Sequence, residues 1–171
     1  MRPLLAAALV VMLVGPVAAA PAASQPASAR VLEVEDGHVL RVQMGRWERR
    51  VRLACVDTPE ASQQPWARDA AGALSRLVPP GSTVTVELRA RDVYDRIVAV
   101  VRNQQGDVAP GLLQQGLIFA FDGYLGRCDD LAYKQAEALA REQQRGVWAV
   151  PGGIERPWDI REKQGDRRSE P

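Results

Sequence analysis

Arg52, Asp57 and Glu60 are the residues whose types and spacing best suit hydrolysis of a phosphodiester. Such hydrolysis needs positive charge on the phosphate oxygens, a base that orients and deprotonates water, and often a metal ion that bridges water and phosphate. Arginine suits the first task because its planar guanidinium can hold two phosphate oxygens and stays charged at any relevant pH. Glu60 is the candidate base and Asp57 the candidate metal ligand. Taken alone, the pattern also fits a charged strand end followed by a polar turn.

The segment that must position these side chains, residues 51–60, is predicted to be a strand that ends at a proline. Side chains alternate along a strand, so the apolar residues face a core while Arg52 lies on the other face. Pro59 cannot continue a hydrogen-bonded ladder, which places both carboxylates at an ordered strand-end loop. Binding and catalytic groups often occupy such loops.

The remaining pattern predicts a small α+β domain. Apolar residues alternate on both sides of Asp36-Gly37, which indicates a hairpin. The expected fold is a five-stranded OB-fold Greek-key β-barrel with three α-helices, one of them between the third and fourth strands. Beyond the hairpin and the segment at 51–60, strands are expected near 83–90 and 97–101, and helices over 65–78, 107–116 and 130–145.

Residues 1–22 have the composition of a secretory signal peptide, with a basic start, an apolar middle and a small-residue finish. Cleavage is expected between Ala19 and Ala23. A membrane anchor is the alternative, although Gly15-Pro16 interrupts the apolar run and no basic stop-transfer residues follow it. We therefore expect a periplasmic or secreted protein that has no membrane contact after cleavage.

Three further segments complete the predicted organisation. Residues 23–30 form a proline-containing spacer that is expected to be disordered. Residues 31–150 form one domain, and residues 151–171 form a polar tail that is expected to be mobile from Glu162 onward.

The net charge of the chain is +1, from 22 Lys and Arg against 21 Asp and Glu. Removal of the leader takes away Arg2 and leaves 21 − 21 = 0. A neutral chain does not attract a polyanion through bulk charge, so any binding of nucleic acid must come from a local patch.

Cys55 and Cys128 are the two cysteines of the chain. Export permits a disulfide between them, because oxidising compartments allow such bonds. The alternative is two separate thiols, with Cys55 a small core residue.

Several motifs occur in one order along the chain: Asp36-Gly37, V-R-L-A-C-V-D-T-P-E at 51–60, D-x-Y-x-R at 92–96, Q-Q-G-L at 114–117 and A-E-A-L-A-R…G-V-W at 136–148. Together they resemble the thermonuclease family, the staphylococcal-nuclease-like enzymes with an OB-fold barrel and three helices. The resemblance covers about residues 31–148. The tail segment Arg156-Pro-Trp-Asp-Ile-Arg161 is also similar to a Pro-Trp-acid-x-Arg segment of exported bacterial members.

The resemblance implies roles for four of these residues. Arg52 and Arg96 would clamp the scissile phosphate, and Glu60 would be the base or water-orienting carboxylate. Tyr94 matches a tyrosine that contacts a terminal phosphate; the alternative is a half-buried aromatic residue at a strand start.

The resemblance also implies a calcium ion, held by Asp57 and the carbonyl of Thr58 and supported by Asp36. The family motif reads Asp-Gly-Asp, whereas this chain has His38 at the third position, so one carboxylate ligand is missing. Neutral imidazole is a poor calcium ligand. Three outcomes stay open: weak calcium use with compensation by Asp36 or Glu35, a metal that accepts nitrogen, or lost activity with retained binding. His38 could equally be a hairpin residue with no ligand role.

The leading hypothesis is an exported, monomeric, sugar-nonspecific endonuclease that hydrolyses DNA and RNA by metal-assisted attack of water. The alternative is a catalytically weak or inactive OB-fold module that binds nucleic acid or protein. Low aromatic content, 5% of residues, argues against an extensive base-stacking surface and favours the nuclease.

Overall fold

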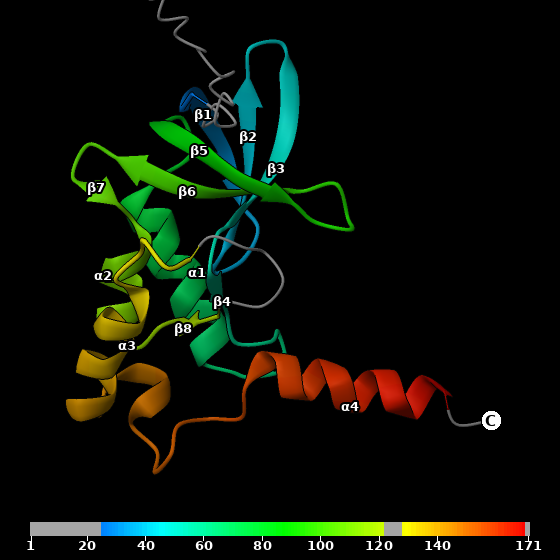
Figure 1. Ribbon diagram of the computed structural model, residues 1–171, viewed down its shortest axis with the longest axis vertical. Coiled ribbons are helices and arrows are strands. Elements are labelled where there is room, and N and C mark those ends of the chain that lie inside the picture. The colour runs from blue at the N-terminus through cyan, green and yellow to red at the C-terminus, as the bar shows by residue number, and fades with distance from the viewer. Residues whose placement is uncertain (1–24, 122–127, 170–171) are drawn as a thin grey trace, which may run out of the picture.

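Five strands close into a barrel in the computed structural model, which describes residues 25–121 and 128–169 (Figure 1). Antiparallel pairing gives the order β3-β2-β1-β5-β6, and β3 then pairs in parallel with β6, which closes the barrel. This arrangement confirms the predicted α+β fold with a five-stranded OB-type barrel. The strands are β1 (Ala27–Val34), β2 (Val39–Met44), β3 (Trp47–Leu53), β5 (Thr83–Arg91) and β6 (Ile97–Asn103).

Helices and three very short strands surround the barrel. The described residues contain four α-helices, one more than predicted, and none of them has the length and apolar content needed to cross a membrane. The helices are α1 (Trp66–Leu77), α2 (Ala109–Gln114), α3 (Tyr133–Glu142) and α4 (Pro157–Ser169), with a 3-10 turn η1 at Gly146–Trp148. The short strands are β4 (Val56–Asp57), which pairs with β8 (Phe119–Ala120), and β7 (Gly106–Asp107), which extends β6.

One hydrophobic core joins the barrel interior to the helices. The apolar side chains of β3 and β6 enter it together with Leu74 of α1 and Leu112 of α2. Residues 97–101 of β6 are buried without a break, which is how a continuous apolar run behaves in a strand covered on both faces. The polar site therefore rests on a core that fixes the end of β3.

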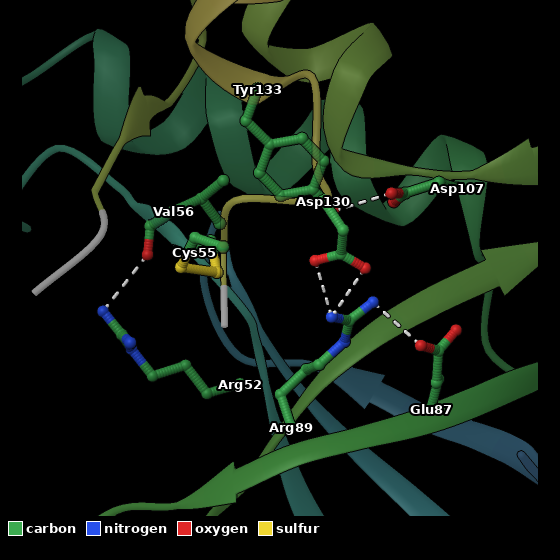
Figure 2. The surroundings of a disulfide bond; sticks show 9 residues. Arg52, Cys55, Val56, Glu87, Arg89, Asp107, Asp130 and Tyr133 are labelled. Carbon is green, nitrogen blue, oxygen red and sulfur yellow. Dashed lines mark hydrogen bonds and ion pairs between the residues drawn. A yellow bond between two sulfur atoms is a disulfide. The ribbon is translucent and has the colours of Figure 1, made fainter. Parts of the chain in front are cut away.

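A disulfide joins Cys55 to Cys128, with Cα atoms 5.8 Å apart (Figure 2). Cys55 lies in the tight turn between β3 and β4, where its φ of 59° is in the left-handed region. The bond ties this turn to the segment that leads into α3. Arg89 beside it donates to both Asp130 and Glu87, so the same side of the barrel is also linked by charge.

Both ends of the described chain depart from the predictions. The predicted signal peptide lies outside the described residues. Residues 27–30, expected to belong to a disordered spacer, are the start of β1; they pair with residues 83–86 of β5, and such backbone pairing does not require large apolar side chains. The tail, expected to be mobile from Glu162, is instead helical to Ser169. Its first turn is docked by Trp158, which stacks on Phe121 at 4.8 Å.

Candidate active site

Arg52 is held at the end of β3, opposite Val39 of β2 and Val98 of β6. It is only 5% exposed, and its Nη2 donates to the carbonyl of Val56 at 3.2 Å. Burial lowers the pKa of Arg52; the carboxylate of Asp57 opposes this shift, and the charge of Arg96 adds to it. Its Nη1 is buried without a hydrogen-bond partner among the described residues. A buried, charged donor with spare capacity is suited to an anionic oxygen.

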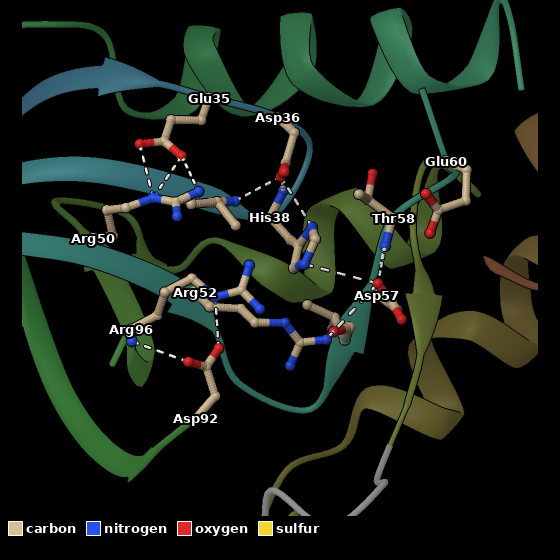
Figure 3. Close-up of polar contacts among 12 residues, drawn as sticks. Glu35, Asp36, His38, Arg50, Arg52, Asp57, Thr58, Glu60, Asp92 and Arg96 are labelled. Carbon is tan, nitrogen blue, oxygen red and sulfur yellow. Dashed lines mark hydrogen bonds and ion pairs between the residues drawn. The ribbon is translucent and has the colours of Figure 1, made fainter. Parts of the chain in front are cut away.

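Arg96 approaches from the turn between β5 and β6 and is fixed by Asp92 (Figure 3). The Arg96 Nε donates to Asp92 Oδ2 at 2.5 Å, while Asp92 Oδ1 accepts from the backbone N–H groups of Tyr94 and Arg96. Burial favours the neutral form of Asp92, but these hydrogen bonds outweigh it and hold the pKa of Asp92 below its ordinary value. Tyr94 is 74% exposed, with the Arg96 guanidinium 5.2 Å from its ring centre. It is thus not the half-buried residue of the alternative interpretation.

Asp57 is the most buried carboxylate of the site, with its side chain 1% exposed. Its Oδ1 accepts from the N–H of Thr58 at 3.0 Å and lies 3.7 Å from both Arg52 Nη2 and His38 Nε2. Its Oδ2 accepts from Nη2 of Arg161. Burial of a carboxylate at this depth is costly without such partners, and Arg52 and Arg161 supply them.

The turn between β1 and β2 brings Asp36 and His38 to the same region. Asp36 Oδ1 accepts from the N–H groups of His38 and Val39, each at 2.8 Å, and lies 2.9 Å from His38 Nδ1. Burial acts to raise the pKa of Asp36, but the contacts with His38 and Val39 prevail and lower it. Gly37 packs so closely that an added Cβ would lie 2.2 Å from Thr58 Oγ1. Only glycine allows the two loops to approach this closely.

Glu60 lies in the loop after β4 and is fixed at its backbone, where its N–H donates to Gln63 Oε1 at 2.8 Å. Its carboxylate accepts from Nη1 of Arg161 at 2.6 Å. Arg161 comes from α4 and therefore reaches both Glu60 and Asp57. Its side chain is 44% exposed, in contrast to that of Arg52.

These side chains form two adjoining groups. An open cleft of about 330 Å³ is lined by Asp36, His38, Asp57, Thr58, Glu60 and Arg161, among others. The second group is Arg52 and Arg96, which lie beside one another next to this cleft. Arg52 connects the two groups through its contact with Asp57. The structure thus brings the predicted catalytic residues into one region, although the contact that Glu60 makes there is with Arg161.

The predicted metal ligands are neighbours but do not form a divalent-cation site in this arrangement. Within residues 25–121 and 128–169, no cluster of three or more His, Cys, Asp or Glu side chains is placed to hold one ion. Asp36 is engaged by its own turn, His38 stands between Asp36 and Asp57, and the outer oxygen of Asp57 is bonded to Arg161. The donor set of Asp57, Thr58 and Asp36 therefore does not fit the ion as it stands.

Sequence reasoning missed two residues of the site. Asp92, which fixes Arg96, begins the D-x-Y-x-R motif, and its spacing from the arginine is the signal that points to it. Arg161 ends the Arg156–Arg161 segment, whose resemblance to exported members is a signal, but 104 residues separate it from Asp57. No local pattern predicts a contact over that distance.

Comparisons with known proteins point to one family. The family model described as staphylococcal nuclease homologue matches residues 50–150. A probable endonuclease of Verticillium alfalfae is 34% identical over 134 residues, which are 70% of this chain and 46% of that protein. An uncharacterized endonuclease of Haemophilus influenzae is 32% identical over 136 residues, 78% of this chain and 74% of that protein. A micrococcal nuclease of Shigella flexneri is 30% identical over 142 residues, 77% of this chain and 78% of that protein.

The extent of these matches separates two parts of the site. Arg52, Glu60 and Arg96 lie within the residues that the family model matches, whereas Arg161 lies beyond them. The chain spans about half the length of the Verticillium relative and about three quarters of the two bacterial ones.

Proposed function

Because the chain belongs to the staphylococcal nuclease family, we propose that it is an exported, sugar-nonspecific endonuclease that hydrolyses phosphodiester bonds of DNA and RNA. The single observation that carries the proposal is the pair of neighbouring arginines, Arg52 and Arg96, of which Arg52 lies beside the buried carboxylate of Asp57. Localisation to the periplasm or the medium follows from the predicted leader, and a monomer is the proposed state.

The proposed roles follow from the contacts of each side chain. Arg52, with its spare buried Nη1, and Arg96, fixed by Asp92, hold the phosphate oxygens that gain charge as water attacks. Glu60 orients and deprotonates the water. This role requires its carboxylate to face the cleft. Tyr94, exposed beside Arg96, contacts the substrate next to the scissile phosphate. The proposed substrate is single-stranded or locally open DNA and RNA.

A divalent metal, with calcium as the first choice, belongs to the proposal through the family alone. Asp57, Thr58 and Asp36 are its proposed ligands, although they do not converge here. The roles given to Arg52, Glu60 and Arg96 do not depend on the ion.

The test is a cleavage assay with matched arginine variants. The purified protein is incubated with single-stranded DNA and RNA oligonucleotides in calcium, in manganese and in chelator. We expect cleavage that Arg52→Ala reduces by a factor on the order of 10²–10³, the usual cost of losing one donor to a developing anion. Arg49→Ala, an exposed arginine of the same strand that contacts Trp47, should leave cleavage unchanged.

Equal cleavage by the protein and by Arg52→Ala in every condition would sink the enzyme proposal. The alternative, a weak or inactive nucleic-acid-binding module, predicts salt-sensitive binding without metal and without cleavage. His38, at the position of an expected carboxylate, is the observation that favours it.

A further inference from the structure

Arg161 makes a contact that the proposed chemistry does not use. One guanidinium donates through Nη1 to Glu60 Oε1 at 2.6 Å and through Nη2 to Asp57 Oδ2. Glu60 is the proposed water-orienting group, and Asp57 is the deepest acid of the site. A single side chain from α4 therefore bonds to both the proposed water-orienting carboxylate and a proposed metal ligand.

The charges around Arg161 explain why it stays there. Partial burial acts to lower the pKa of Arg161, but the carboxylates of Asp57 and Glu60 outweigh it and raise the pKa. Asp57 and Glu60 both line the cleft, and Arg161 bonds to both of their carboxylates. Carboxylate oxygens are the ligands that a hard divalent cation prefers.

The helix that carries Arg161 is docked mainly by its first turn. Pro157 is buried, Trp158 packs on Phe119 and Phe121, and residues 161–165 are exposed. In Figure 1, α4 extends away from the body of the molecule after this turn. Arg161 follows this docked turn, and its side chain can leave the two carboxylates while the aromatic contacts of Trp158 remain.

We infer that Arg161 is an internal cation of the site that competes with a divalent metal ion for Asp57 and Glu60. The guanidinium already takes the outer oxygen of Asp57, and a doubly charged ion beside it would meet a like charge at close range. Metal and Arg161 thus exclude each other, and the docking of α4 sets the metal affinity. This inference deepens the proposed function and, in its meaning for catalysis, rests on it.

The experiment measures metal binding in the absence of nucleic acid. Mn²⁺ is titrated into the full-length mature protein, and bound ion is followed by calorimetry and by loss of the free-ion electron paramagnetic resonance signal. Because a charge-assisted hydrogen bond no longer has to be given up, Arg161→Gln should bind Mn²⁺ on the order of tenfold more tightly. Arg161→Lys, which keeps the charge but cannot span two carboxylates, should lie between the two.

Lys163→Gln is the matched control. It removes the same charge from the same helix, but Lys163 bonds to Glu155 outside the cleft, at 2.5 Å. Its Mn²⁺ affinity should stay within about twofold of the parent, since exposed ion pairs contribute little. Equal or weaker binding by Arg161→Gln, binding by Lys163→Gln that rises as much, or no binding by any of the proteins, would overturn the inference.

Failure of this inference and failure of the proposed function give different results. Tighter Mn²⁺ binding by Arg161→Gln with no cleavage that depends on Arg52 leaves the competition in place and removes the nuclease. Cleavage that depends on Arg52, with Mn²⁺ affinity unchanged by Arg161→Gln, does the reverse.

Discussion

Arg52 and Arg161 contact the same carboxylate, Asp57, but Arg52 comes from a barrel strand and Arg161 from a peripheral helix. Arg52 stands on a strand paired on both sides, five residues before Asp57, and is 5% exposed. Arg161 stands on a helix docked by one turn, 104 residues away along the chain, and its side chain is 44% exposed. The position of the first follows from the core, whereas the position of the second follows from a surface contact.

The difference separates a fixed charge from an exchangeable one. To move Arg52, the pairing of β3 with β2 and β6 would have to break, at a cost near that of unfolding. Moving Arg161 requires only that two charge-assisted hydrogen bonds be replaced, by water or by another cation. The site therefore has two halves. The fixed half contains Arg52, whose charge is permanently available to an anion, and the exchangeable half contains Arg161, whose charge can be replaced.

The largest expected effect on stability comes from removing the disulfide next to the fixed half of the site. The double variant Cys55→Ala/Cys128→Ala frees the turn between Arg52 and Asp57 and reopens a loop whose ends are 73 residues apart. We expect the free energy of unfolding to fall by about 4 kcal/mol, mainly through the regained entropy of the unfolded chain. Urea denaturation of the variant and of the disulfide-bonded parent protein measures this loss, and the reduced parent should behave like the variant. A loss below about 1 kcal/mol would mean that the barrel alone fixes this turn.

A pair of glycine variants tests whether the two halves differ in packing as well. Gly37→Ala would place a Cβ 2.2 Å from Thr58 Oγ1 and 2.6 Å from Ala70 Cβ, so the hairpin must shift. We expect a loss of about 1–3 kcal/mol, as for other overpacked sites, together with weaker cleavage. Gly165→Ala in α4 meets nothing within 4 Å and should raise helix content without loss of stability. Equal losses in thermal denaturation would contradict the contrast.

The fixed half is also the half that can be predicted from sequence. Period-two alternation predicts the faces of β3, and the amino-acid pattern alone puts Arg52, Asp57 and Glu60 around one strand end. The predicted end at Pro59 is wrong, because β3 ends at Leu53, before the turn at Cys55, and only the two-residue β4 follows that turn. The contact between Arg96 and Asp92 is local and lies within one short motif. The helical tail and the reach of Arg161 are not predictable in this way, because α4 has a weak apolar pattern and is held by aromatic residues far away in sequence. Likewise, β1 begins at Ala27 because of its partner β5, not its own composition.

A smaller effect on stability is expected from the contact that fixes Arg96, which is less buried than Arg52 and more buried than Arg161. The lowered pKa of Asp92 means that its ionised form stabilises the folded state above the ordinary aspartate pKa, and that this contribution disappears as pH falls through the lower native value. At pH 7, Asp92→Asn should therefore be less stable by about 1 kcal/mol, the net value of one such pair. Unfolding in urea at pH 7, 5 and 3 measures the difference between parent and variant.

That difference should shrink only in the most acidic samples. Asp36, whose pKa is also lowered, is present in both proteins, so its contribution cancels. A difference that grows on acidification would mean that Asp92 is not stabilised as the anion and that Arg96 is fixed in some other way.

The smallest effect on global stability is expected from the anchor of the exchangeable half. Trp158→Ala removes the stacking on Phe121 at 4.8 Å and the edge contact with Phe119 at 5.9 Å. Because α4 is docked by one turn outside the barrel, its release should lower the free energy of unfolding by less than about 1 kcal/mol. Hydrogen exchange should nevertheless show faster exchange over residues 157–169 alone. Since Arg161 leaves with the helix, Mn²⁺ affinity should rise as it does in Arg161→Gln.

Trp47→Ala is the control for loss of an indole, since Trp47 is 53% exposed at the tip of the β2–β3 hairpin and contacts only arginines there among the ring contacts of the described residues. It should change neither exchange in α4 nor metal affinity. If Trp158→Ala instead unfolds the whole domain, α4 is part of the core and Arg161 is as fixed as Arg52. If it frees the helix but leaves Mn²⁺ affinity unchanged, the charge of Arg161 is not what holds the metal away from Asp57.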